Sequence, residues 1–134
     1  LPGWVERRQS NAQTLKQSLS ARSAIAFPGD SPHQVNSYYR LSLLIDPDRL
    51  REDWPRNRIL AELNTRGIPA RVGACPDIGQ EPVFRNRGEK LPSRPHAAWV
   101  GARSFVLPVH PTLTEDDLGY MADQVREIVA SAAR

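Results

Sequence analysis

The chain is poor in the residues that build disulfide frameworks and metal sites. It has a single cysteine, Cys75, among 134 residues, so no disulfide can form within it. Its three histidines, at positions 33, 96 and 110, stand far apart and lack the spacing of a zinc site. The sequence therefore predicts a fold held by an apolar core, with no metal-binding residues.

Long apolar runs are also missing. The longest, 41–45 and 105–109, have the length of strands and fall far short of the roughly 20 apolar residues that span a bilayer. No basic segment followed by an apolar run opens the chain, which argues against a secretory signal. We expect a cytoplasmic protein without membrane contact. Because the first residue is Leu1 rather than Met, we also expect a piece of a longer protein.

Lysine is scarce, and arginine supplies every cation except Lys16 and Lys90. A net charge of +3 with this arginine content raises the possibility of nucleic-acid or phosphate binding. However, the arginines are spread from Arg7 to Arg134, and neither an aromatic RNA-binding motif nor a helix-turn-helix pattern accompanies them. We therefore expect no nucleic-acid partner.

The composition that remains is that of one folded domain, with 40% hydrophobic and 25% charged residues. Residues 3–21 are predicted to form a helix, because apolar residues recur there at helical spacing: Trp4, Val5, Ala12, Leu15 and Leu19. Arg8 falls on the same stripe, which favours packing against a partly polar surface or a partner domain. We expect Trp4, Leu15 and Leu19 to be exposed in this chain.

Further elements follow from periodicity and from proline and glycine. Alternation predicts strands over 37–45, 68–74 and 104–109. Helices are predicted from Pro55 to the stop at Gly67, over 93–102, and after an N-cap at Thr114. The proline-rich stretch 75–95 is predicted to be an ordered loop with one helical turn. This order fits a small α/β or α+β domain with a three-stranded sheet.

Several segments resemble the C-terminal region of the DegT/DnrJ/StrS family of pyridoxal-phosphate-dependent nucleotide-sugar aminotransferases. The most specific is a strand, turn and capped helix at the end of the chain, and an opening helix resembles the one that joins the family's two domains. The segments are FVLPVHPTLTEDDL (105–118), NSYYRLSLLID (36–46), RGIPARVGACPD (66–77), GACPDIGQEPVF (73–84) and LPGWVERRQSNAQTL (1–15).

The resemblance implies a fold and a domain division. Residues 1–22 would be the interdomain helix and 23–134 the C-terminal small domain, an α+β unit with a three-stranded, mainly antiparallel sheet packed with helices, as in fold-type I enzymes. The large domain that binds pyridoxal phosphate would be absent from this chain, which would bind no cofactor itself.

The resemblance also implies an activity for the full-length enzyme. It would transfer an amino group from glutamate to a nucleotide-linked keto sugar, in polysaccharide, lipopolysaccharide or antibiotic-sugar biosynthesis, as a homodimer. The alternative is a free-standing small module that binds a ligand or a protein and has no catalytic activity.

The resemblance implies five candidate substrate-binding residues: Asn36, Tyr38, Cys75, Asp77 and Gln80. It places the loop from Gly73 to Glu81 at the mouth of the active site, and Asn36 and Tyr38 where the first strand approaches the cofactor and the sugar. Asp77 and Gln80 can hydrogen-bond sugar hydroxyls, and Cys75 can fill a small polar niche. The structural alternatives stay open: Cys75 as a small buried residue, Asp77 as a turn residue and Tyr38 as part of the core. The loop lacks the histidine that most of the family carries there.

No catalytic residue is expected in this chain. Schiff-base chemistry needs a lysine with a lowered pKa, a carboxylate for the cofactor ring and a phosphate cup. Lys16 on a helix flank and Lys90 in a Gly-Glu-Lys loop are interpreted as solvated side chains, and neither occupies a family catalytic position. His110, in a strand-to-helix turn, is interpreted as structural rather than as a general base.

We therefore predict that the purified 134-residue chain, mixed with pyridoxal phosphate and glutamate, develops no yellow Schiff-base absorbance and transfers no amino group. Absorption spectra and an amino-transfer assay with nucleotide-linked keto sugars measure this. A yellow, catalytically active chain would contradict it.

Overall fold

The computed structural model describes residues 2–21, 24–29, 33–88 and 91–134. Within these ranges the elements in chain order are α1 (Pro2–Leu19), β1 (Ile25–Ala26), β2 (Leu41–Ile45), η1 (Pro47–Arg49), α2 (Arg56–Thr65), β3 (Arg71–Val72), η2 (Ile78–Gln80), α3 (Pro82–Arg85), α4 (Pro95–Arg103), β4 (Ser104–Leu107) and α5 (Glu115–Ala132). No helix in this part of the chain is long and apolar enough to cross a membrane.

The sheet has four strands in the order β1-β2-β4-β3, and every neighbouring pair is antiparallel. The α+β class and the antiparallel pairing are confirmed, but the prediction of three strands is wrong. The missed strand, β1, has two residues, and Ile25 pairs with Ile45 at the far end of β2. Two residues are too few for an alternating pattern to be visible in a sequence.

All three predicted strands are shorter than expected. The strand predicted over 104–109 ends at Leu107, directly before Pro108. The strand predicted over 37–45 begins only at Leu41, because Tyr38 has a φ of 47° and breaks the extended conformation. The strand predicted over 68–74 is reduced to Arg71–Val72. Pro69 lacks the N–H group that a longer ladder would need.

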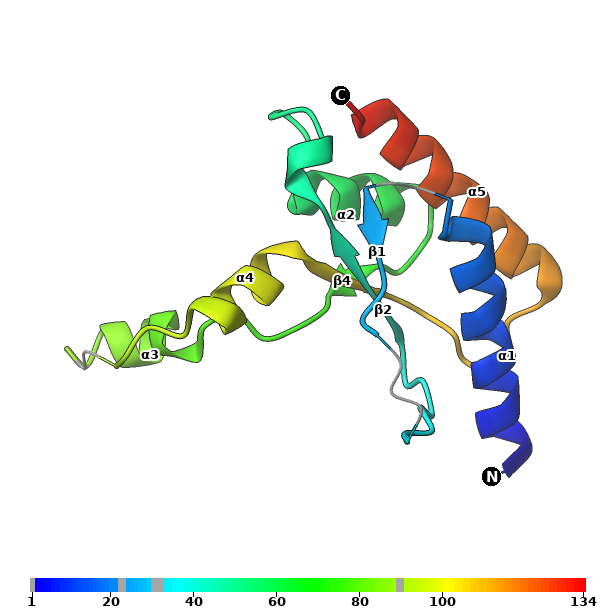
Figure 1. Ribbon diagram of the computed structural model, residues 1–134, viewed down its shortest axis with the longest axis horizontal. Coiled ribbons are helices and arrows are strands. Elements are labelled where there is room, and N and C mark those ends of the chain that lie inside the picture. Colours follow the sequence, from blue (N-terminus) through cyan, green and yellow to red (C-terminus); the bar gives the residue numbers. More distant parts are fainter. Residues whose placement is uncertain (1, 22–23, 30–32, 89–90) are drawn as a thin grey trace.

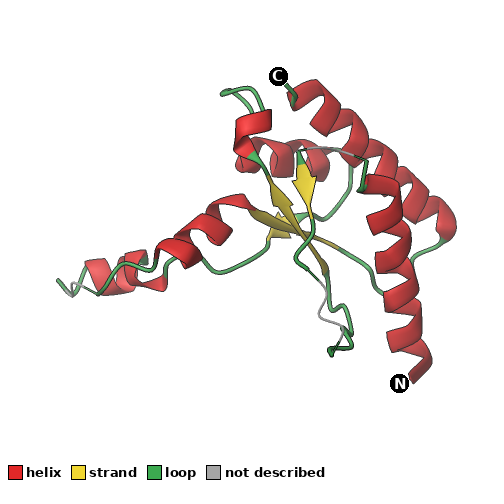
Figure 2. Cartoon of the chain, viewed as in Figure 1, coloured by secondary structure: helices red, strands yellow, loops and turns green. Residues whose placement is uncertain are grey.

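One face of the sheet carries the apolar core. The register pairs Leu43 with Phe105 and Leu41 with Leu107, and all four side chains are buried together with residues of α1, α2 and α5. Figure 2 shows these helices packed around the sheet. The opposite face is more open, because Ser42 and Arg71 are exposed there.

Helix α1 is part of this core. Leu15 and Leu19 are fully buried, and α1 runs beside α5 (Figure 1). The expectation that both leucines are exposed is therefore wrong, since α5 supplies the covering surface within the chain. Trp4, near the start of α1, is exposed as expected.

A segment of residues 74–88 and 91–103, which we call the arm, carries η2, α3 and α4 away from the sheet (Figure 1). The prediction of a loop with one helical turn followed by a helix is close to this arrangement. Gly101 of α4 packs directly on Pro76 at the base of the arm, where an added Cβ would lie 2.6 Å from the Pro76 Cα. The two ends of the arm are therefore clamped together by a contact that only glycine permits.

This clamp gives a matched pair of variants. Gly119 lies in α5, and a Cβ added there would meet nothing within 4 Å, so Gly119→Ala is expected to stabilise the chain by about 0.5–1 kcal/mol through helix propensity. Gly101→Ala is expected to destabilise it, because Pro76 must move. Urea unfolding measures both, and limited proteolysis should cut the arm faster in Gly101→Ala. Equal stabilisation of both variants would contradict the clamp.

Helix α5 begins with the N-cap predicted from the sequence. The Thr114 side chain accepts a hydrogen bond from the Asp117 N–H, and the Asp117 carboxylate accepts one from the Thr114 N–H at 2.8 Å. This is a reciprocal capping box. Hydrogen bonds from Thr114, first from its backbone N–H and then from its hydroxyl, lower the pKa of Asp117.

A lowered pKa in the folded state means that Asp117 contributes stability above its unfolded pKa of about 3.9, and that this contribution disappears as the pH falls through the lower folded value. Asp117→Asn should therefore be less stable than the unmodified chain at neutral pH, with the gap narrowing in acid. Thr114→Ala should cost about 1 kcal/mol. Urea midpoints measured from neutral pH down into acid test this, and a gap that widens in acid would refute it.

Candidate functional site

The five sequence-predicted site residues fall into two groups. Asn36 and Tyr38 lie in the segment before β2, whereas Cys75, Asp77 and Gln80 lie at the beginning of the arm. The structure brings Asn36 and Tyr38 together, since both line one hollow of about 100 Å³. None of the three arm residues lines that hollow.

Asn36 and Tyr38 are joined in a tight turn. The Asn36 Oδ1 accepts a hydrogen bond of 2.8 Å from the Tyr38 N–H, and the Asn36 carbonyl accepts one of 2.9 Å from Gln9 of α1. Tyr38 is the only non-glycine residue with a positive φ in the described part of the chain. Such strained conformations persist where surrounding contacts hold them and are concentrated at functional sites.

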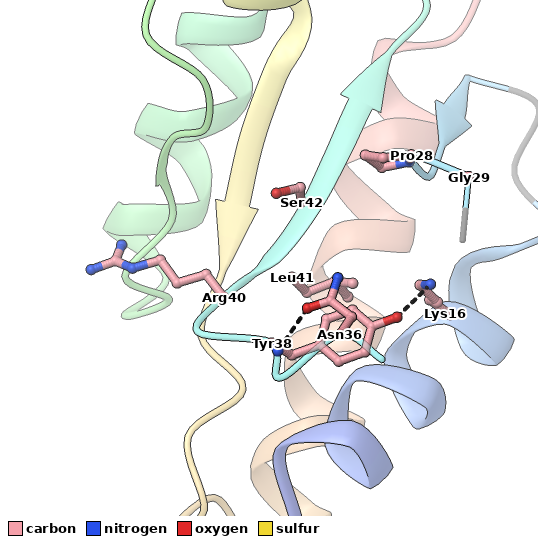
Figure 3. Close-up of a pocket in the computed structure, with 8 residues that line it drawn as sticks. All are labelled: Lys16, Pro28, Gly29, Asn36, Tyr38, Arg40, Leu41 and Ser42. Carbon is pink, nitrogen blue, oxygen red and sulfur yellow. Dashed lines mark hydrogen bonds between the residues drawn. The ribbon is translucent and has the colours of Figure 1, made fainter. Parts of the chain in front are cut away.

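The Tyr38 ring packs against the core, and its hydroxyl meets a cation at the edge of the hollow. Lys16 Nζ donates a hydrogen bond of 2.9 Å to this hydroxyl (Figure 3). The same ammonium lies 5.2 Å from the Tyr38 ring centroid and 6.0 Å from that of Phe27. Core packing and a role at the site are thus compatible for Tyr38.

The arm residues have different surroundings. Asp77 is buried, and its carboxylate accepts hydrogen bonds from the Arg94 N–H at 3.0 Å and the Gly79 N–H at 3.2 Å. The Arg94 N–H is the main cause of a lowered pKa for Asp77. Asp77 therefore closes the turn that begins η2. Gln80 accepts a hydrogen bond from Arg85, and Cys75 is exposed with a free thiol.

A second region, not identified from the sequence, lies on the open face of the sheet. Two adjoining hollows of about 320 and 580 Å³ share Tyr39, Arg40 and Arg71. Arg8 and His110 also line the smaller one, and Asn36 lines the larger one. Figure 3 shows the Arg40 side chain directed away from Lys16. The signal in the sequence was Arg8, which interrupts the apolar stripe of α1.

Of the two lysines, only Lys16 lies among the described residues. The ammonium of Lys16 is held against Tyr38 and Phe27, and no carboxylate residue lines the adjoining hollow in the described ranges. Lys90 lies outside the described residues. In the same ranges no group of three or more histidine, cysteine or acidic residues could hold a metal ion.

Comparison with known proteins identifies similar sequences and folds. The chain is 30% identical to the aminotransferase from Psychrobacter cryohalolentis, with a TM-score of 0.86 over 98% of this chain and 35% of that structure. Among curated proteins, it is 28% identical to an uncharacterised protein of Methanocaldococcus jannaschii over 93% of this chain and 32% of that protein.

A further curated relative is the dTDP-4-dehydro-2,6-dideoxy-D-glucose 3-dehydratase of Saccharopolyspora spinosa, at 24% identity over 94% of this chain and 27% of that enzyme. The chain thus spans about a third of the length of the proteins that it matches. The model of one aminotransferase family matches residues 1–126. This chain therefore belongs to the DegT/DnrJ/EryC1/StrS aminotransferase family.

Proposed function

We propose that this chain is the C-terminal small domain of a pyridoxal-phosphate-dependent enzyme that transfers an amino group, from glutamate, to a nucleotide-linked keto sugar. The observation that carries the proposal is the match to the Psychrobacter aminotransferase, which covers nearly all of this chain and only about a third of that structure. A chain whose fold corresponds to one third of an aminotransferase is expected to act together with the remaining two thirds.

In this proposal residues 1–22 join the two domains, and residues 23–134 form the small domain itself. The exposure of Trp4 at 63% fits a helix whose first turns meet another domain. Its later turns belong to the small domain, because Asn11 donates a hydrogen bond of 3.0 Å to the His110 carbonyl. Helix α1 would therefore transmit the position of one domain to the other.

The cofactor would be held outside this chain, where it would supply the electron sink for amino transfer. The contribution of this chain would be to bind and orient the sugar. The turn of Asn36 and Tyr38 is held by Gln9 and Lys16, so its polar atoms have fixed positions before a substrate arrives. Cys75, Asp77 and Gln80 would form a second wall if the arm closes over the sugar.

The name of the dehydratase relative restricts the class of substrate more than it restricts the type of reaction. Its name specifies a dTDP-linked keto sugar, and amino transfer and dehydration can both begin from such a compound. We therefore propose a nucleotide-linked keto sugar as substrate. We also propose a homodimer as the assembly and the cytoplasm as the compartment. Polysaccharide, lipopolysaccharide or antibiotic-sugar biosynthesis would use the product.

The test uses the protein encoded by the whole reading frame that contains these residues. With pyridoxal phosphate, glutamate and a dTDP- or UDP-linked keto sugar, mass spectrometry should detect an amino sugar. Tyr38→Phe removes the hydroxyl that Lys16 contacts and should raise the KM for the sugar about fivefold, as expected for one hydrogen bond. Tyr120→Phe is the matched control, because its exposed hydroxyl contacts the Arg66 carbonyl on another part of the chain.

Detection of a dehydrated sugar without nitrogen would refute amino transfer. The reaction would then be a dehydration, as in the name of the dehydratase relative. No turnover, together with a start codon directly before Leu1, would instead support the free-standing binding module. Equal KM values for both tyrosine variants would show that Tyr38 does not bind the substrate. They would not contradict the proposed reaction.

A further inference from the structure

Three arginines from separate elements converge on the smaller hollow of the open sheet face. Arg8 comes from α1, Arg40 from the residue before β2, and Arg71 from β3. Tyr39 and His110 complete the polar lining, and the volume is about 320 Å³. We call this group of five residues the arginine pocket.

No aspartate or glutamate lines this pocket in the described part of the chain. Elsewhere arginines pair with carboxylates, as in Arg58 with Asp53 at 2.8 Å and Arg66 with Glu127 at 3.0 Å. Arg8 has a buried Nε atom with no hydrogen-bond partner among the described residues. Like charges that converge without a counter-charge repel each other, and a buried unpaired donor costs about 1–3 kcal/mol. An anion bound between the guanidinium groups would offset their mutual repulsion.

The backbone beneath the pocket is held in place. Asn11, one turn after Arg8, is buried and donates hydrogen bonds to the carbonyls of Val109 and His110 at 3.4 and 3.0 Å. Arg71 sits opposite Val106 in the β3–β4 ladder. Arg40 precedes Leu41, which pairs with Leu107 of the same strand β4. The backbone segments that carry the three arginines are therefore anchored to the same strand, β4, and to the segment that follows it.

The chemistry favours a multiply charged phosphate compound. A guanidinium group binds phosphate oxygens through two parallel N–H donors, and several such groups suit a diphosphate with its larger charge. Tyr39 is 75% exposed beside the pocket, and Arg40 lies 5.5 Å from its ring centroid. An exposed aromatic ring next to a phosphate site can also stack on a nucleotide base or sugar.

We propose that the arginine pocket binds the diphosphate group of the nucleotide-linked sugar. This inference rests on the proposed function for the identity of the ligand. The larger adjoining hollow contains Asn36 together with Arg40 and Arg71, so a diphosphate held by the arginines would place the attached sugar toward the turn of Asn36 and Tyr38. The pocket would thus fix the nucleotide end, and the turn would meet the sugar end.

The test is calorimetric titration of the 134-residue chain with inorganic pyrophosphate, dTDP and glutamate at low salt. Pyrophosphate and dTDP should bind, and glutamate should not compete with them. Arg40→Gln and Arg71→Gln should each weaken dTDP binding about tenfold or more, as expected for the loss of a charged hydrogen bond. Arg87→Gln, at an exposed arginine of the arm, is the matched control and should change nothing. Circular dichroism establishes that each variant is folded.

The proposal is overturned if the folded chain binds neither pyrophosphate nor dTDP at millimolar concentration, or if both pocket variants bind dTDP as the unmodified chain does. Displacement by glutamate would assign the pocket to the amino donor and would also overturn it. In the protein of the whole reading frame, Arg71→Gln should raise the KM for the nucleotide sugar about tenfold with kcat nearly unchanged. If Arg71→Gln forms the amino sugar with an unchanged KM, the role of the pocket in diphosphate binding is refuted but the proposed function is not. If the protein binds dTDP but shows no turnover, only the proposed function is refuted.

Discussion

The antiparallel pairing of β2 with β4 is the constraint on which the rest of the structure depends. It places Leu43 opposite Phe105 and Leu41 opposite Leu107, and this apolar face collects α1, α2 and α5 into one core. Because side chains alternate along a strand, the same register directs Ser42 and Val106 to the other face. The covered and open faces of the domain are therefore consequences of one pairing.

The open face derives its chemistry from this arrangement. Arg40 and Arg71 flank the central strands, and Arg8 reaches the same region because Asn11 ties α1 to the segment after β4. Considered for the helix alone, an arginine within the apolar stripe would weaken the packing of that helix against a core. In the folded domain Arg8 instead contributes a cation to a concave surface.

The sequence was sufficient for the elements with strong local signals. Thr114 and the acidic residues after it identified the start of α5, and Gly67, with a φ of 78°, identified the end of α2. It was insufficient where tertiary contacts decide: β1 exists because its two residues meet the end of β2, and Leu15 and Leu19 are buried because α5 lies beside them.

The candidate site divides in the same way. The family motif identified the segment of Asn36 and Tyr38, but the positive φ of Tyr38 and its contact with Lys16 depend on α1 and could not be read from local spacing. Asp77 was identified as either a ligand group or a turn residue, and its carboxylate is in fact engaged by the Gly79 and Arg94 N–H groups. The arginine pocket combines residues 8, 39, 40, 71 and 110, which come from four separate segments of the sequence and are brought together only by the fold.

The length of the outer strands has a consequence for assembly. Both edges of the sheet, β1 and β3, consist of two residues, and Pro69 and Pro76 stand on either side of β3. An edge this short presents too few backbone donors and acceptors to template a further strand. Strand-by-strand polymerisation, to which longer open edges are prone, is therefore disfavoured at both edges of this sheet.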